Sequence, residues 1–383
     1  MKRILLFALL AAAAFGCATE NGTQRGVALA PHGVQFDVDL EWHYPLSNKP
    51  LPPFGAFPLD QGRAVDVGGV TYATSTLGKV VAIKDSSAVA LWTRDFEMPV
   101  TAGPVVSGNA VYVGLSNGAV LRLDARDGKE KWRFDAGAVV ENGLSANDGL
   151  VAIVNANNRA MLLDAETGTV RWRRERPRGQ EFTMYGQCAP LIDGGVVYAG
   201  FSDGTLVAYA ASNGTAIWTR DLAPKERFKD LDVTPLRVRD VLYVASSSGG
   251  LYALSVDDGH TIWQKDIQGI SSVSAFQDSL FVSSQLGVFR LRMSDGATIW
   301  QNEIQGDTLF SPLALGKNSI YVAVQQFGLA ILDRKSGKLR HVFDMGTDFT
   351  SPPCLTDGRL SILSNRSTVY RFIVDDAPVA DMM

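Results

Sequence analysis

One structural unit recurs along most of this chain, and its recurrence limits the possible folds more than any other feature. Two copies read "VYVGLSNGAVLRLDARDGKEKW" (111–132) and "LYVASSSGGLYALSVDDGHTIW" (242–263). Each copy closes at an aromatic position, 20 residues after an equivalent position in its first strand in six copies and 19 in one. The closing residues are Trp92, Trp132, Trp172, Trp218, Trp263, Trp300 and His341. A fixed period of this length indicates a solenoid, a propeller or an array.

Each copy has the composition of short strands joined by tight turns. Runs such as "VYVG" and "LYAL" are β-branched or aromatic and are separated by Gly, Asn, Ser or Asp. A glycine stands four positions before six of the seven closing aromatics, where a tight hairpin requires positive φ. These glycines are Gly128, Gly168, Gly214, Gly259, Gly296 and Gly337. The recurring Asp124, Asp164 and Asp333 are expected to bond backbone amides of the same turns, and so to be structural.

A further short strand precedes each copy, which gives four strands in about forty residues, the size of a β-propeller blade. Seven units are complete, and an eighth, at 351–374, lacks its fourth strand. The segment 40–46, which carries Trp42, can supply it. The sequence therefore predicts an all-β, eight-bladed β-propeller of four-stranded antiparallel blades, closed by an N-terminal strand that joins the C-terminal blade. Such closure leaves no long exposed edge, and the recurring Trp is expected to pack between neighbouring blades.

The N-terminus has the pattern of an export signal. Lys2 and Arg3 precede an apolar run at 4–15, which is shorter than the roughly 20 residues of a membrane-spanning helix. The run ends in "AFGC", which resembles a bacterial lipobox, so Cys17 is expected to be lipidated. Ordinary secretory cleavage is the alternative. Ala18 after the cysteine favours the outer membrane in lipoproteins of this kind.

These signals divide the chain into four parts. We expect a lipoprotein signal peptide at 1–16, a lipidated cysteine with a flexible tether at 17–35, the propeller at 36–375 and a disordered tail at 376–383. The tether composition is small, polar and aperiodic. Cys188 and Cys354 would form a disulfide only if the fold brings them together.

Two connections between units are longer than the others. From the closing aromatic to the next unit's first strand there are 26 residues after Trp172 and 25 after Trp218, against 18–21 in the other interior cases. Both connect the outermost strand of one blade to the innermost strand of the next. Connections of this kind emerge on one face, so consecutive ones are neighbours. We expect one raised patch from 173–188 and 219–233, whose charged, aromatic and Met residues suit a protein interface.

Other chemistry lacks support in the sequence. The four histidines are scattered without zinc-ligand spacing. The net charge of −4 gives no support to nucleic-acid binding.

The repeats resemble those of quinoproteins, enzymes that hold pyrroloquinoline quinone over the propeller axis with a Ca²⁺ ion and often a disulfide between adjacent cysteines. Here no two cysteines are adjacent and no cluster of oxygen donors is evident. We therefore expect no cofactor, no metal and no enzymatic activity.

The signal, tether and compact propeller together resemble the BamB family, the lipoprotein subunits of the outer-membrane β-barrel assembly (Bam) machinery. The sharper match is "ERFKDLDVTP" (226–235), which is similar to a family stretch with an Arg and two spaced Asp residues before "TP". The resemblance implies that Arg227, Asp230 and Asp232 contact a POTRA domain of BamA, the barrel-inserting subunit. It also implies that Met184 and Tyr185 of the preceding connection contact this domain. The family commonly has Leu-Arg at these two positions.

The resemblance thus implies a non-enzymatic scaffold lipoprotein of the outer membrane, facing the periplasm, that docks on a BamA-like subunit of the Bam complex and assists assembly and insertion of β-barrel proteins. Two alternatives stay open. One is a propeller that binds another envelope partner or a polysaccharide, and the other is a quinoprotein dehydrogenase.

Overall fold

The computed structural model describes residues 25–26, 38–47, 62–176, 188–222, 230–231, 233–246, 250–302, 310–325, 328–344 and 348–378. Every regular element named in these ranges is a β-strand. Within the same ranges, no helix has the length and apolar character needed to cross a membrane.

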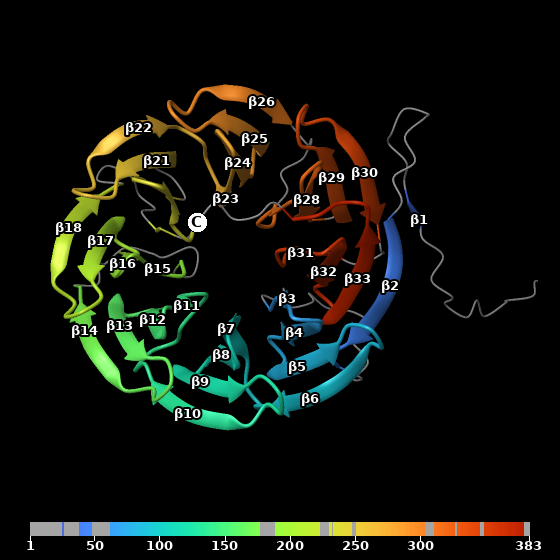
Figure 1. The fold of residues 1–383 in the computed structure, drawn as a ribbon, viewed down its shortest axis with the longest axis horizontal. Helices are drawn as coiled ribbons and strands as arrows, with labels where there is room; N and C mark the ends of the chain where they lie inside the picture. The colour runs from blue at the N-terminus through green and yellow to red at the C-terminus, as the bar shows by residue number, and fades with distance from the viewer. Residues whose placement is uncertain are drawn as a thin grey trace, which may run out of the picture.

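The strands form eight antiparallel sheets arranged as a ring (Figure 1). Blades 1 to 4 are, from the innermost strand outward, β3 (Ala64–Val67), β4 (Val70–Thr74), β5 (Lys79–Lys84) and β6 (Val89–Asp95); β7 (Val100–Ser107), β8 (Ala110–Leu115), β9 (Ala119–Asp124) and β10 (Glu130–Asp135); β11 (Leu144–Asn147), β12 (Leu150–Asn155), β13 (Arg159–Asp164) and β14 (Val170–Glu175); and β15 (Leu191–Asp193), β16 (Val196–Gly200), β17 (Thr205–Ala210) and β18 (Ala216–Asp221).

Blades 5 to 8 follow in the same order: β19 (Leu236–Val238), β20 (Val241–Ser246), β21 (Gly250–Ser255) and β22 (Thr261–Lys265); β23 (Ile270–Phe276), β24 (Ser279–Ser284), β25 (Gly287–Arg292) and β26 (Thr298–Asn302); β27 (Ala314–Leu315), β28 (Ser319–Val324), β29 (Gly328–Asp333) and β30 (Leu339–Asp344); and β31 (Cys354–Thr356), β32 (Arg359–Leu363), β33 (Thr368–Val374) and β2 (Val38–Pro45). A two-residue strand, β1 (Arg25–Gly26), adds to the outer edge of blade 7 beside β30.

The eight-bladed propeller predicted from the repeats is confirmed, and so is its closure. Blade 8 takes three strands from the C-terminal part of the chain and its outermost strand, β2, from the N-terminal part. The register pairs Val38 with Val374 and Pro45 with Thr368. Figure 1 shows this junction as the blue β2 beside the red β33. The ring therefore closes by hydrogen bonding between two ends of the chain.

The recurring tryptophans pack between blades, as predicted. From Trp92 to Trp300, each indole lies against the hairpin glycine of the next blade; at Gly168, whose φ is +70°, an added Cβ would lie 2.7 Å from Cδ2 of Trp132. The indole N–H also reaches the next blade: Trp132 Nε1 donates to the carbonyl of Ala165 at 3.1 Å. Only glycine fits there, because the hairpin needs positive φ and the ring leaves no room for Cβ.

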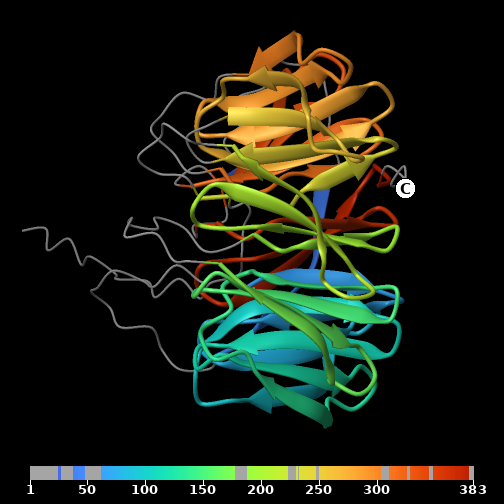
Figure 2. The same cartoon turned by 90° about the vertical axis from the view of Figure 1, so that its left-hand side faces the viewer.

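An antiparallel meander fixes which connections share a face of the disc. The connections from each outermost strand to the next innermost strand emerge on one side, here called the connection face. The hairpins that contain the recurring glycines emerge on the other side, the hairpin face. Figure 2 shows the disc nearly edge-on, with the strands of each blade running between these two faces.

The ordered chain continues past residue 375, where the sequence-based boundary placed the start of a disordered tail. Asp376 is 8% exposed, and its carboxylate accepts a hydrogen bond from the backbone N–H of Ser319 at 2.9 Å. Lys317 N–H donates to the Ala377 carbonyl at 2.8 Å, and Pro378 forms a bridge with Gly316. Residues 376–378 thus pack on blade 7 at the hairpin face.

Candidate functional site

The predicted docking patch begins and ends in described residues, but most of it lies outside them. Of the predicted site residues, Cys17, Met184, Tyr185, Arg227 and Asp232 lie outside the described residues, and only Asp230 lies within them. The structure therefore describes only the bases of the two long connections. These connections run from Arg176 to Cys188 and from Leu222 to Asp230.

The first connection leaves blade 3 from a fixed point. Arg176, directly after β14, pairs with Asp203 of blade 4 at 3.2 Å. Its guanidinium also lies over the ring of Phe201, 5.6 Å from the centroid, where cation–π attraction adds to the ion pair. Its backbone N–H donates to the Asn158 carbonyl at 3.1 Å. The start of this connection is thus held to two blades.

The ends of the two connections meet. Cys188 N–H lies 3.4 Å from the Leu231 carbonyl, and Leu231 N–H lies 3.5 Å from the Phe201 carbonyl. Both side chains press on Gly200, where an added Cβ would lie 2.9 Å from Cys188 Sγ and 2.9 Å from Leu231 Cβ. The expectation that the two long connections are neighbours is confirmed at their bases. Cys188 and Cys354 are both free, so the disulfide left open by the sequence does not form.

Asp230 is not presented on the surface. Its exposed fraction is 3%, that of Leu231 is 2%, and Leu231 belongs to the core cluster that contains Leu222 and Trp218. Asp230 also interacts with other groups of the chain. A carboxylate that is buried and has partners is suited to holding the connection in place. The sequence could not show this, because the pattern Asp-Leu-Asp does not reveal which side faces inward; the apolar Leu231 between the acids was the available signal.

A polar groove of about 370 Å³ opens beside the start of the second connection, between blades 4 and 5. Its walls are partly fixed by hydrogen bonds: Arg220 Nε donates across the blades to the Gly259 carbonyl at 2.8 Å, and within blade 5 Gln264 Nε2 donates to the Tyr252 hydroxyl at 3.0 Å. Tyr252 in turn donates to the Leu222 carbonyl. This groove borders the predicted patch and was not anticipated from the sequence.

A larger cavity of about 800 Å³ lies among the innermost strands of blades 3 to 8. Its walls are mainly apolar, with Leu236, Val273 and Leu355 among them, and Arg237 pairs with Asp193 at 3.1 Å near its mouth. Quinoproteins hold their cofactor over this axis. Among the described residues, no group of three or more His, Cys, Asp or Glu side chains is arranged to hold a metal ion.

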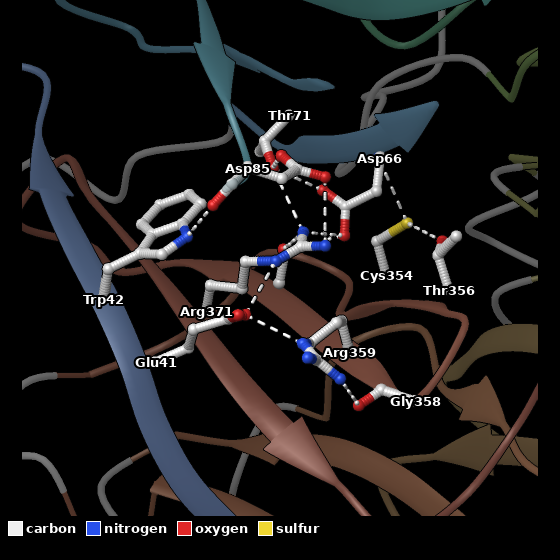
Figure 3. A network of polar contacts seen from close by, with 11 residues as sticks. Glu41, Trp42, Asp66, Thr71, Asp85, Cys354, Thr356, Gly358, Arg359 and Arg371 are labelled. Carbon is white, nitrogen blue, oxygen red and sulfur yellow. Dashed lines mark hydrogen bonds and ion pairs between the residues drawn. The ribbon is translucent and has the colours of Figure 1, made fainter. Parts of the chain in front are cut away.

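The densest set of buried ionisable groups lies where blade 8 meets blade 1, here called the seam cluster (Figure 3). At its centre Arg371, 7% exposed at the side chain, contacts Asp66 at 2.7 Å, Asp85 at 3.0 Å and Glu41 at 3.2 Å. Burial raises the pKa of the Asp66 carboxyl, and Arg371 offsets part of that rise. Each of these carboxylates pairs with Arg371, so the cluster is suited to holding blade 8 against blade 1.

Comparison with known proteins gives a consistent assignment. The family model described as outer membrane protein assembly factor BamB matches residues 36–138 and 78–302, more than half of the chain. A BamB from Xanthomonas campestris is 34% identical over 262 residues, which cover 61% of this chain and 63% of that protein. The chain thus spans less than two thirds of the length of the curated relatives it matches.

Solved structures show the same fold. The crystal structure of BamB from Moraxella catarrhalis superposes with a TM-score of 0.74 at 21% identity, covering 81% of this chain and 95% of that one. A quinohemoprotein alcohol dehydrogenase from Comamonas testosteroni superposes with a TM-score of 0.68 at 15% identity, covering 91% of this chain and 78% of that one. The propeller architecture is thus shared by assembly factors and dehydrogenases, and the family model that matches more than half of the chain decides between them: this chain belongs to the family of outer membrane protein assembly factor BamB.

Proposed function

We propose that this protein is a non-enzymatic scaffold of outer membrane protein assembly, which docks through its two long connections on the barrel-inserting subunit of the Bam complex. Family membership supports the assembly role. The observation that carries the docking site is the junction of Cys188 with Leu231, which holds the two connections side by side at one corner of the connection face. Fixing the bases of two connections side by side on the ring lowers the reorganisation that binding requires.

Within this corner we assign different roles to the predicted residues. Arg227, Asp232, Met184 and Tyr185 are proposed to contact a POTRA domain of a BamA-like partner. Asp230 and Leu231 are proposed to fix the second connection, because both are buried. Tyr185 stands where the family commonly has Arg, so the first connection is proposed to contribute aromatic and apolar contact with little charge.

The docking proposal is tested by pull-down of the barrel-inserting subunit from solubilised membranes. Arg227→Glu and Asp232→Ala are expected to lower its recovery, while Asp266→Ala is the matched control. Asp266 begins the equivalent connection after blade 5, and its partner there, Gln268, is also exposed. Undiminished recovery with both docking variants, with the propeller still folded, would contradict this site.

The anchoring proposal is separate and has its own test. We propose that Cys17 carries lipid and holds the protein at the outer membrane, facing the periplasm. Several acyl chains on one residue bind a membrane stably, because each buried CH₂ contributes about 0.8 kcal/mol. Cys17→Ser is expected to move the protein from the membrane fraction to the soluble fraction and to abolish incorporation of radiolabelled palmitate. Retention at the membrane without palmitate would show that partners alone hold it there.

The competing function is a quinoprotein dehydrogenase. The shared fold and the central cavity are the reasons to test it. The absence of catalytic activity is part of our proposal. Purified protein would be incubated with pyrroloquinoline quinone and Ca²⁺ and assayed for dye-linked oxidation of alcohols. Turnover that depends on the quinone would refute the non-enzymatic assignment without bearing on the docking corner.

A further inference from the structure

The seam cluster joins three parts of the chain that are far apart in sequence. Glu41 comes from the N-terminal strand β2, Asp66 and Asp85 come from blade 1, and Arg371 comes from β33 of the C-terminal blade. Figure 3 shows these side chains converging on the guanidinium. The ring is closed at this point, so the charge balance of the cluster bears directly on closure.

The hydrogen bonds around Thr71 require more protons than its hydroxyl has. Thr71 Oγ1 lies 2.7 Å from Asp66 Oδ1 and 2.7 Å from Asp85 Oδ1. A hydroxyl donates one hydrogen and accepts through its lone pairs. Two contacts of this length to two carboxylates are both favourable only if one carboxylate carries a proton and donates it to the threonine oxygen.

The surroundings identify Asp66 as the protonated member. Its side chain is 1% exposed, against 13% for Asp85. Its other oxygen, Oδ2, already accepts from Ser361 Oγ at 2.8 Å and from Arg371 at 2.7 Å, which leaves Oδ1 to hold the proton. Burial and the nearby Asp85 charge both raise the pKa of Asp66, with burial the larger cause.

Several charged groups lie around Asp66. The cations are Arg371 and Arg359, and the latter pairs with Glu41 at 2.9 Å. The anions are Glu41 and Asp85. Cys354 of β31, whose Sγ accepts from the Asp66 backbone N–H at 3.4 Å, is held neutral because burial raises the pKa of its thiol. Arg63, just before β3, is a further cation; it is partly buried, and burial lowers its pKa without removing its charge. Ionised Asp66 would place an extra negative charge beside Asp85 with little water to solvate it.

We propose that the seam between blades 8 and 1 is a proton-dependent latch, in which a proton held on Asp66 Oδ1 keeps the ring closed and its loss weakens the contact of β2 and β33 with blade 1. The sign follows from the direction of the shift. A carboxyl whose folded pKa is raised contributes its stability fully below its unfolded pKa, and that stability is lost as pH rises through the folded value. The contact of β2 and β33 with blade 1 is therefore most stable in acid and becomes less stable as pH rises.

The first test uses the full chain without any substitution. Infrared spectra near neutral pH are expected to show the C=O band of a buried carboxylic acid, and that band is expected to disappear as pH rises. Over the same range, hydrogen exchange corrected for its intrinsic pH dependence is expected to accelerate in β2 and β33 and to stay constant in β17 of blade 4. A missing acid band, or acceleration spread evenly over all blades, would overturn the proposal.

The second test compares two matched substitutions. Asp66→Asn keeps the shape and is permanently neutral, so its denaturation midpoint is expected to lose the wild-type decline with pH, and the infrared band is expected to vanish. Asp85→Asn removes the neighbouring charge and supplies an amide N–H that can donate to Thr71, so the decline and the loss of the band are both expected to move to lower pH. Between the unfolded and folded pKa values of Asp66, where the folded chain keeps the proton and the unfolded chain has lost it, the unfolding equilibrium constant of the wild type rises at most about tenfold per pH unit. An unchanged pH slope in Asp66→Asn would refute the latch.

Discussion

The contact between blades can be tested at a pair of glycines that differ in one respect only. Gly149 and Gly168 lie in hairpins of the same blade, blade 3, and both have φ of +70°. An added Cβ at Gly149 meets nothing within 4 Å, whereas at Gly168 it would lie 2.7 Å from Cδ2 and 2.9 Å from Cγ of Trp132. Alanine at Gly149 therefore reports the backbone strain alone, and alanine at Gly168 reports the strain together with the steric overlap.

The magnitudes follow from these two contributions. A left-handed conformation costs an ordinary residue about 1–2 kcal/mol, which is the expected loss of stability for Gly149→Ala. Overpacking against a fixed ring costs a further 1–3 kcal/mol or so, which gives about 2–5 kcal/mol for Gly168→Ala. Guanidinium denaturation followed by tryptophan fluorescence measures both. In a Trp132→Ala background the cost of Gly168→Ala is expected to fall to that of Gly149→Ala. Equal costs for the two glycines in the wild-type background would refute the view that the indole and hairpin lock neighbouring blades.

Three further predictions address individual positions. Ala88 stands at the hairpin site that is glycine in six other blades and has φ of 52°, so Ala88→Gly is expected to stabilise the protein by about 1 kcal/mol in thermal melts; a loss would contradict strain at this turn. Burial raises the pKa of Tyr243 to about 12, so its stabilising contribution is present below the ordinary tyrosine pKa and lost as pH rises toward 12; spectrophotometric titration of Tyr243→Phe should lack one late-ionising phenol. Arg371→Leu leaves buried carboxylates without their cation and is expected to cost about 3–5 kcal/mol, measured by denaturant unfolding; a cost below 1 kcal/mol would mean that the acids simply take up protons.

The blades were predictable because each one repeats the same physical solution. A closing aromatic and a glycine four residues earlier occur together, since the indole of one blade needs the bare hairpin of the next. The exceptions follow the same logic. His341 replaces Trp at the one blade whose following neighbour, blade 8, has no hairpin at that place, because its outermost strand comes from the other end of the chain. The joint occurrence of the closing Trp and the hairpin glycine therefore predicts the contact between blades as well as the fold.

The seam cluster and the role of Asp230 were not predictable for a different reason. Asp66 and Arg371 are 305 positions apart in the chain, and nothing in either local pattern refers to the other. Asp230 lies in a connection, where no strand alternation assigns side chains to an inner or outer face. Repetition predicts what recurs, whereas the features that differentiate one blade from another depend on single contacts.

These single contacts make one side of the ring different from the other. Blade 8, which contains the seam, faces blade 4 across the ring, and the two long connections flank blade 4. On the other side, Arg25 and Gly26 pair with Asp344 and Phe343 at the end of β30, so the chain toward Cys17 leaves from the rim of blade 7. Cys17 lies eight positions before Arg25, a reach of about 27 Å when extended. If lipid on Cys17 holds one rim at the membrane, the proposed partner contacts the opposite side, and any load between them passes through the ring. The strand that joins the tether to the ring is β2, which is also the strand that Glu41 fastens to Arg371 at the seam. The proposed latch therefore lies on the N-terminal strand that closes the ring, and not at the proposed docking corner.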